Sequence, residues 1–387
     1  MRFVLRIRMK IGIDVRYLSH GLVGGIHTYM KNIMPLIMQQ AHERGHVVVF
    51  YADTKAKFEF ESHTLPSNVS VRLLPWRNKL SSFRHDVLMY REMAQDKLDV
   101  VHFAGNYGFA PKSWKTVVTL QDEINLLPLK DIYKGHKKEL TVLWMFPWLH
   151  FASLASVRRA SRVVTISDYS KRQIARFGNI SPNKMDVVYH GCPFDIQRVT
   201  DEGKLSEVRQ RLGLHKPFVL AEAFKNPGVL VRAWKQLPAE VQCKYEIVFF
   251  SRSENVWPPV TEAVDAGYAK LFVRPARTDL SALFSLCQAF VFPSWIEGFG
   301  IPLTEAMTCG APIIASDRAA VPEVVGEAGL IMDAEDDRKL VDYLMRMFTQ
   351  PQEQERLRQL GLARAPKFTW KNAAAQMLDV FERVAGD

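Results

Sequence analysis

Short runs rich in Val, Ile and Phe alternate with helical stretches along the whole of this 387-residue chain. Seven of these runs lie in the first half, at residues 9–15, 46–52, 69–75, 99–105, 115–121, 161–167 and 184–190. Six lie in the second half, at residues 217–223, 245–251, 270–276, 289–294, 311–316 and 328–333. β-rich runs separated by helices are typical of parallel sheets built from strand–helix–strand units. The pattern therefore predicts an α/β chain with two doubly wound domains.

The two sets of strands are separated by a polar, charged segment, residues 192–215. A chain of this length is expected to form about two domains. We therefore predict an N-terminal domain over residues 1–195, a C-terminal domain over residues 196–369 and a final helix over residues 370–387. Residues 1–8 precede the natural opening strand, and we interpret them as a dispensable extension or as an extra basic strand.

Composition limits the class of protein. Hydrophobic residues make up 48% of the chain and the mean hydropathy is −0.09, values that suit a soluble protein with packed cores. The four cysteines are widely spaced without a C-x-x-C pair, which argues against disulfides and against a zinc site. We find no signal peptide and no run of about 20 apolar residues, so we expect a cytoplasmic protein without a membrane-spanning helix.

Charge is unevenly distributed between the two halves. Residues 1–191 carry 28 Lys and Arg against 15 Asp and Glu, whereas residues 192–387 carry 23 against 26. A basic half beside a near-neutral half indicates a polyanionic partner for the first half. Because no nucleic-acid-binding motif is present, we favour an anionic membrane surface over nucleic acid.

The segment Ser294–Pro312 reads SWIEGFGIPLTEAMTCGAP and carries the strongest functional signal. It follows an apolar run and contains glycines that permit a tight turn and close backbone approach to a ligand. Pro302 suits the first position of a helix, and Gly310 suits its end. The first turn of this helix would offer unpaired N–H groups and a positive dipole end, which together favour a phosphate.

Two carboxylates, Glu297 and Glu305, flank this predicted anion site with seven residues between them. A carboxylate can accept two hydrogen bonds side by side, as the vicinal hydroxyls of a sugar require. A phosphate site between two diol receptors matches a nucleotide-sugar, with its ribose, diphosphate and hexose. The alternative is an ordinary strand, loop and amphipathic helix with two surface glutamates.

The full string resembles the signature of family 4 glycosyltransferases, retaining enzymes with the two-domain GT-B fold. The resemblance extends over nearly the whole chain. It implies two Rossmann-like doubly wound domains that face each other across a cleft, with the C-terminal helix crossing back to the N-terminal domain. It further implies a nucleotide-sugar donor, no bound metal and no cofactor.

In the first half, the resemblance implies roles for residues at the ends of three predicted strands. Gly24 and Gly25 match the family's glycine loop, which approaches the donor phosphates. His102 ends the run DVVHFAG near the family's cleft, although a lone histidine at a strand end also suits a packed or capping role. The family's next strand often ends in His-Asp; here the residues are Gln121 and Asp122, so Asp122 is left to orient the acceptor.

In the second half, the family usually has an arginine and a lysine that bind the diphosphate. This chain keeps Lys225 but shows Glu222 and no nearby arginine. Arg274 or Arg277 could supply the missing charge. The predicted catalytic residues are thus Glu297, Lys225, His102 and Asp122. The predicted donor-binding residues are Gly24, Gly25, Lys225, Arg274, Glu297, Gly298, Phe299, Gly300, Leu303, Thr304 and Glu305.

Two further segments have competing interpretations. The acidic run 333–337 could mimic a metal site, but it reads better as a polar loop followed by the negative first turn of a helix. Residues 130–162 combine lysines (Lys130, Lys134, Lys137, Lys138) with WMFPWLHF and three arginines. This combination suits a helix in a membrane interface, or else a buried helix with a basic flank.

Together these features predict a retaining hexosyltransferase in polysaccharide biosynthesis. A UDP-hexose such as UDP-glucose is the first choice of donor and GDP-mannose the second. The expected acceptor is a saccharide or a lipid-linked saccharide. The alternatives are a catalytically weak nucleotide-sugar or membrane-binding module and a nucleotide-sugar 2-epimerase, although the epimerases lack the E-G-F-G string.

Overall fold

The computed structural model describes residues 9–21, 24–60, 65–133 and 140–386, and the prediction for residues 1–8 lies outside these ranges. The chain divides into two compact units. Unit 1 runs to His190 and includes the C-terminal segment from Trp370, whereas unit 2 is Gly191–Thr369. The division falls five residues before our predicted boundary. Residues 191–195 belong to unit 2 because the Cys192 N–H donates to the Phe368 carbonyl and Arg277 donates to the Asp195 carboxylate.

Within the described residues, unit 1 contains a seven-stranded parallel sheet with the strand order β3-β2-β1-β4-β5-β6-β7. Every strand coincides with one of the runs predicted from the sequence, and β2 extends one residue beyond its run. The strands are β1 (Lys10–Asp14), β2 (Val47–Asp53), β3 (Val69–Leu74), β4 (Val100–Phe103), β5 (Thr116–Thr119), β6 (Arg162–Thr165) and β7 (Met185–Val187).

Unit 2 contains, within the described residues, a six-stranded parallel sheet with the order β10-β9-β8-β11-β12-β13. The strands are β8 (Phe218–Glu222), β9 (Glu246–Ser251), β10 (Ala269–Val273), β11 (Ala289–Phe292), β12 (Ile313–Ser316) and β13 (Gly329–Met332). In each sheet, successive strands are first added toward one edge and then toward the other, so the strand order changes direction once, as in doubly wound folds. The predicted fold class, two Rossmann-like parallel sheets, is therefore confirmed.

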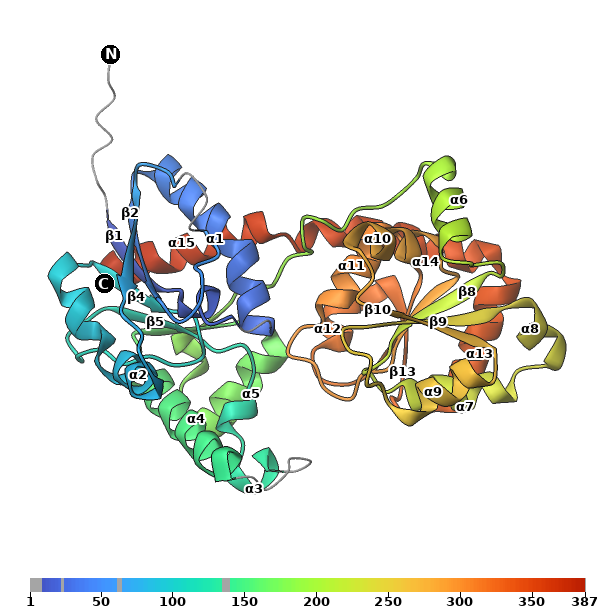
Figure 1. Cartoon of the computed structure of the whole chain (residues 1–387), viewed down its shortest axis with the longest axis horizontal. Helices are drawn as coiled ribbons and strands as arrows, with labels where there is room; N and C mark the ends of the chain where they lie inside the picture. The colour runs from blue at the N-terminus through green and yellow to red at the C-terminus, as the bar shows by residue number, and fades with distance from the viewer. Residues whose placement is uncertain (1–8, 22–23, 61–64, 134–139, 387) are drawn as a thin grey trace, which may run out of the picture. The chain divides into compact units, whose positions relative to one another are not determined.

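Helices cover both faces of each sheet (Figure 1). Those of unit 1 are α1 (Gly25–Arg44), α2 (Lys79–Met93), α3 (Leu129–Ile132), α4 (Leu140–Arg159), α5 (Asp168–Gly178) and α15 (Trp370–Gly386). Those of unit 2 are α6 (Glu202–Arg211), α7 (Pro227–Gln236), α8 (Ala239–Lys244), α9 (Pro258–Asp265), α10 (Arg277–Leu286), α11 (Ile301–Cys309), α12 (Val321–Val325), α13 (Asp337–Thr349) and α14 (Pro351–Arg364). The 3₁₀ turns are Arg16–Leu18, Ala94–Asp96, Ile124–Leu126, Pro182–Lys184, Gly326–Ala328 and Ala365–Lys367.

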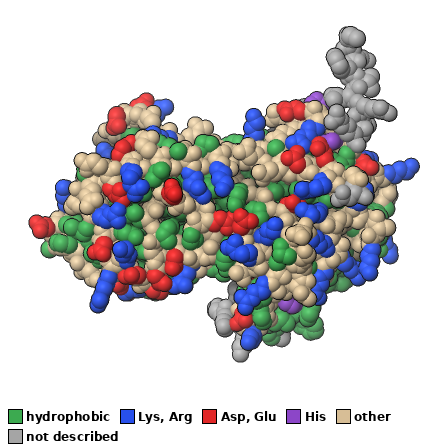
Figure 2. Space-filling model, turned by 180° about the vertical axis from the view of Figure 1, so that it is seen from behind, with side chains coloured by type: hydrophobic (Ala, Val, Ile, Leu, Met, Phe, Trp, Pro, Cys, Tyr) green, Lys and Arg blue, Asp and Glu red, His purple; other side chains and the backbone are tan. Residues whose placement is uncertain are grey.

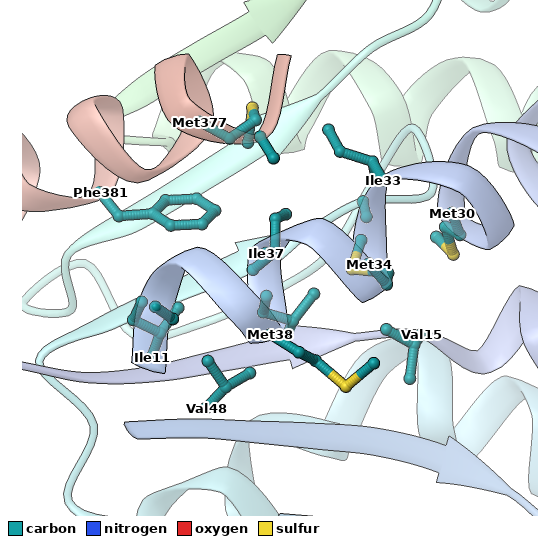
Figure 3. Close-up of a cluster of buried hydrophobic side chains, with 14 of the residues drawn as sticks. Ile11, Val15, Met30, Ile33, Met34, Ile37, Met38, Val48, Met377 and Phe381 are labelled. Carbon is teal, nitrogen blue, oxygen red and sulfur yellow. The ribbon is translucent and has the colours of Figure 1, made fainter. Parts of the chain in front are cut away.

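The C-terminal helix α15 completes the core of unit 1. Its buried Met377 and Phe381 belong to the same apolar cluster as Ile33 and Ile37 of α1, above β1 and β2 (Figure 3). At the edge of this contact, the Gln40 amide donates to the Lys371 carbonyl at 3.0 Å. Residues from the two ends of the chain therefore share one hydrophobic core.

In unit 2, helices lie on the two faces of the sheet in distinct groups. α7 packs with α9 and α13, whereas α10 and α14 pack with α11 (Figure 1). Because all strands are parallel, the loops after β8, β9 and β11 emerge at the same edge. In open α/β sheets this carboxyl edge is where ligands bind. The segment singled out from the sequence, 294–312, begins at this edge.

Candidate functional site

The loop after β11 folds as its glycines and proline predict. Gly300 has φ of 95°, a left-handed conformation that suits glycine, and it caps α11. Pro302 occupies the second helical position, Ile301 being the first, which corrects our placement by one residue. Gly310, with φ of 75°, ends the helix through N–H bonds to the carbonyls of Ala306 and Met307. The helix thus begins and ends where the sequence indicates.

Glu297 is held in place by an ion pair and a hydroxyl. Its Oε1 lies 2.7 Å from Lys225 Nζ and accepts a hydrogen bond from Ser294 Oγ at 2.8 Å. Lys225 comes from the loop after β8, so the pair joins the loops of two neighbouring strands. We predicted Lys225 and Glu297 from the sequence as separate ligand contacts, and their mutual pairing and the hydrogen bond from Ser294 were not predicted.

Glu305 lies in the first turns of α11 and is buried. Arg277, the first residue of α10, donates to its Oε1 at 2.7 Å and also to Asp195 Oδ1 at 3.1 Å. Burial raises the pKa of the Glu305 carboxyl above its ordinary value, while the charge and hydrogen bond of Arg277 oppose that shift. Arg277 is therefore committed to positioning Glu305, and is less suited to replacing the family's arginine at a phosphate.

A third carboxylate, Glu222, ends β8 at the same edge and is buried. Burial raises the pKa of Glu222, against the charges of Lys225 and Arg252. Arg252 follows β9 and is exposed, and its charge acts on both Glu222 and Glu305. Arg252 is not among the residues that we predicted from the sequence. The available signal was a basic residue directly after a predicted strand at the carboxyl edge.

Arg274 sits at the same edge in a restrained conformation. Its φ is 49°, in the left-handed region, and its Nε donates to the Arg252 carbonyl at 3.1 Å. Its N–H donates to the Ser251 carbonyl at 2.7 Å. These bonds tie Arg274 to the loop after β9, so its role as a donor contact stays a prediction.

Two details of the predicted anion site change. The Leu303 N–H donates to the Gly300 carbonyl at 2.9 Å, so it is occupied and not available as predicted. The Phe299 side chain is buried and packs edge-to-face on Phe368, with ring centroids 5.6 Å apart. The side chain of Phe299 is therefore structural, and only its backbone and those of Gly298, Gly300 and Thr304 stay predicted ligand contacts.

Unit 1 opens its glycine site at the start of α1. Gly24 caps the helix without a side-chain bond, and a Cβ added at Gly24 or Gly25 would meet nothing within 4 Å. Among the described residues, therefore, none fills the space beside these two glycines, and their contact with a ligand stays a prediction.

His102 is packed inside unit 1. It is fully buried, its Nε2 lies 2.8 Å from Thr119 Oγ1, and its ring contacts Phe381 of α15. Burial lowers the pKa of His102 to about 3. These contacts favour the alternative of a packed histidine at a strand end, and a catalytic role for His102 stays a prediction.

The neighbouring strand end is closer to the prediction. Asp122 is partly buried, accepts the Ile124 N–H at 2.9 Å, and has its pKa raised by burial. Gln121 is buried, and within the described part of the chain its Nε2 has no hydrogen-bond partner. These two polar side chains stay candidates for binding an acceptor.

The acidic run 333–337 forms a cap and ion pairs. Asp336 caps α13 by accepting the Lys339 N–H at 2.8 Å, and Arg232 bonds to both Glu335 and Asp337. Over the residues that the structure describes, no group of three or more His, Cys, Asp or Glu is arranged to hold a metal ion. All four cysteines are free thiols.

The amphipathic segment 130–162 forms α3 and α4, with Lys134, Lys137 and Lys138 outside the described residues. Trp144 of α4 is 79% exposed and Phe151 is 59% exposed, whereas Trp148 packs on Phe83 of α2. Figure 2 shows hydrophobic side chains gathered at the lower edge of the molecule, where Figure 1 shows α3 and α4. No helix in the described part of the chain has the length and apolar character needed to cross a membrane.

Comparison with known proteins gives two family matches. Residues 23–195 match the model described as Glycosyltransferase Family 4, and residues 219–350 match the model described as Glycosyl transferases group 1. The first match lies in unit 1 and extends five residues into unit 2, and the second lies wholly within unit 2.

Individual relatives are moderately similar. O-antigen chain mannosyltransferase B of Escherichia coli is 26% identical over 296 residues, which are 74% of this chain and 75% of that protein. The serotype-specific mannosyltransferase WbdA of Escherichia coli is 28% identical over 70% of this chain, but only 34% of its own length is covered. Among solved structures, HepE of Anabaena with UDP and glucose has a TM-score of 0.67 at 17% identity, covering 96% of this chain and 99% of that one.

Proposed function

This chain is a glycosyltransferase of family 4, and on that premise we propose that it moves a hexose from a nucleotide-sugar to a saccharide acceptor, with retention of the anomeric configuration. One observation carries the proposal. Two glutamates, each held by a basic residue, flank the start of α11 at the carboxyl edge of unit 2. Glu305 with Arg277 forms one pair and Glu297 with Lys225 the other.

The two pairs would bind the two ends of the donor. In the proposed role, Glu305 accepts the ribose hydroxyls and Arg277 keeps the buried carboxylate ionised and oriented. Glu297 accepts hexose hydroxyls, and Lys225 stabilises the negative charge that develops on the β-phosphate as it leaves. The Thr304 N–H at the start of α11 would add its dipole to the same phosphate.

Transfer would proceed on one face of the sugar. The bond between the anomeric carbon and the β-phosphate oxygen breaks, the acceptor oxygen bonds to that carbon, and the acceptor proton passes to the departing phosphate. The side chains around this position are committed to ion pairs and hydrogen bonds, so we assign none of them as a covalent nucleophile. Charge stabilisation is then the main task of the protein.

The donor and acceptor are the finer parts of the proposal. The mannosyltransferase relatives favour a mannosyl donor such as GDP-mannose, whereas the neighbour bound to UDP and glucose favours a UDP-hexose such as UDP-glucose. The O-antigen relative supports an acceptor in polysaccharide assembly, either a saccharide or a lipid-linked saccharide.

We also propose that unit 1 rests on an anionic membrane surface. The exposed Trp144 and Phe151 of α4 favour an interfacial helix over a buried one. Exposed Leu80 and Phe83 of α2 add apolar side chains, and Phe83 contacts Trp148 of α4. The basic charge of residues 1–191 supports the anionic character of the partner.

The test is a panel of UDP, GDP, ADP and their sugars, measured by thermal shift and then by transfer to oligosaccharide acceptors. We expect one nucleotide class to stabilise the protein and its sugar to be transferred, with the product anomer identified by NMR. Stabilisation by nucleotide with no transfer to any acceptor would favour the binding module, to which Gln121 in place of a histidine also points. Sugar conversion without an acceptor would favour the epimerase.

A further inference from the structure

Two exposed tryptophans lie beside the proposed donor site in unit 2. Trp257 is 38% exposed and ends the loop after β9, and Trp295 is 46% exposed and lies in the loop after β11. Their ring centroids are 5.5 Å apart and the rings are tilted by 35°. Exposed apolar side chains that lie together can mark a binding site, whereas single ones need no explanation. We call these two residues the tryptophan pair.

The pair is held in place by polar contacts. The Trp295 indole N–H donates to the Glu335 carboxylate. Glu335 in turn accepts a hydrogen bond from Arg232 of α7 at 3.0 Å, and one from Asn226, the residue that caps α7, at 3.3 Å. The orientation of the Trp295 ring is therefore fixed before any ligand arrives, which lowers the entropic cost of binding on it.

The pair also lies on a definite side of the donor site. Arg277 and Glu305 belong to α10 and α11, on one face of the sheet. Trp257 caps α9, and Glu335 joins Trp295 to α7, on the other face. The Lys225–Glu297 pair lies between the two groups, since Lys225 precedes α7 and Glu297 precedes α11.

If the proposed function holds, this arrangement indicates which ligand the tryptophan pair binds. With ribose at Glu305 and hexose at Glu297, the pair lies beyond the hexose, on the side away from the nucleoside. A pyranose presents a flat face of C–H groups with hydroxyls around its rim. That shape matches an exposed indole face with carboxylate and amide groups beside it. We propose that the tryptophan pair is a carbohydrate subsite that binds a pyranose ring of the acceptor saccharide next to the transferred hexose.

The experiment measures saccharide and nucleotide binding separately on the full chain. The probes are mannotriose and maltotriose, followed by tryptophan fluorescence and by saturation-transfer NMR. In Trp295→Ala and Trp257→Ala we expect saccharide affinity to fall about tenfold for each ring lost. Nucleoside diphosphate affinity should stay within about twofold of wild type. In transfer assays the acceptor KM should rise while kcat is kept.

Matched variants control for fold and for exposure. Trp295→Phe keeps a ring and should restore much of the saccharide affinity, although it loses the N–H bond to Glu335. Trp144→Ala removes a more exposed tryptophan from unit 1 and should leave saccharide affinity unchanged. Thermal unfolding of each variant shows whether the fold is intact.

Three results would overturn the proposal. The first is unchanged saccharide affinity in the Trp257→Ala, Trp295→Ala double variant, and the second is no saccharide binding by the wild-type chain. The third is a change of oligomeric state in the double variant, which would make the pair a contact between copies. These outcomes are distinct from failure of the proposed function, which would appear as a wild-type chain that binds no nucleotide-sugar. Saccharide binding that depends on the pair in such a chain would keep the subsite and remove the transferase role.

Discussion

The carboxyl edges of the two sheets are built differently. In unit 2, the edge gathers charged side chains already paired, Glu297 with Lys225 and Glu305 with Arg277. In unit 1, the corresponding edge has a fully buried histidine, His102, and a buried amide, Gln121. The charged side chains of unit 2 are thus held in fixed positions by one another, whereas those named at the edge of unit 1 are uncharged or buried.

The sharpest test of preorganisation in unit 2 is Glu305→Ala. We expect kcat/KM to fall by more than about a hundredfold, because the two charge-assisted bonds that we propose to ribose would be lost and Arg277 loses its partner. Isothermal titration with the nucleoside diphosphate should show the loss as weaker binding. Glu240→Ala, at an exposed position of α8, is the control. Donor affinity near wild type in Glu305→Ala would remove Glu305 from the site.

Lowering the pH should reduce the folding stability of unit 1 more than that of unit 2. Burial lowers the pKa of His102 and of His190 in unit 1 to about 3, from an ordinary value of 6.5. Below pH 6.5 the unfolded chain binds protons that the folded unit does not, so stability falls by about 1.4 kcal/mol per pH unit for each histidine. This loss is present from pH 6.5 down to about 3 and is absent above that window.

The buried carboxylates of unit 2 change its stability with pH in the opposite direction. The pKa values of Glu222 and Glu305 are raised by burial, so the folded unit gains protons before the unfolded chain does as pH falls. Amide hydrogen exchange measured between pH 7 and 5 should therefore show that the amides of unit 1 lose protection as the pH falls, whereas those of unit 2 keep it. Equal loss of protection in both units would contradict this comparison. His215, which is exposed in unit 2, serves as the control when changed to Gln.

Smaller effects are expected for the basic residues at the carboxyl edge of unit 2, which can be ranked by how much affinity for nucleoside diphosphate each variant loses. Lys225→Ala should weaken nucleoside diphosphate binding about tenfold to a hundredfold, because the proposed function has Lys225 contact the β-phosphate and because Lys225 is paired with Glu297. Arg252→Ala should come second, and Arg274→Ala should have the least effect, since its Nε is bonded to the Arg252 carbonyl. If Arg274→Ala proves the worst of the three, Arg274 has taken the place of the missing arginine.

The smallest effect concerns the surface of unit 1. Trp144→Ser together with Phe151→Ser should reduce binding to phosphatidylglycerol vesicles several-fold, because both side chains are exposed on α4. Changing Lys134, Lys137 and Lys138 to Glu should reduce it further and remove much of its salt dependence. Trp257→Ser in unit 2 is the matched control. If none of these variants changes sedimentation with the vesicles, α4 does not bind the membrane, and its exposed side chains would instead contact another protein.

The sequence predicted the fold better than the site, for a physical reason. Strands, turns and helix ends depend on neighbouring residues, so Gly300, Pro302 and Gly310 could be assigned from a short string. The Arg277–Glu305 pair and the approach of Arg252 join segments far apart in the chain, which no local pattern reports. The burial of His102 could not be predicted for the same reason, since the helix that covers it contributes Phe381 from the far end of unit 1's sequence.

The core that α1 and α15 share has a consequence for biosynthesis. Chains emerge from the ribosome N-terminus first, and N-terminal domains usually fold first. Here Met377 and Phe381, which complete the core of unit 1, are made only after the whole of unit 2. Unit 2, whose residues are continuous, can finish folding while unit 1 still lacks its final helix. During that interval the apolar face of α1 stays uncovered, so a nascent chain should depend on chaperones for its older half.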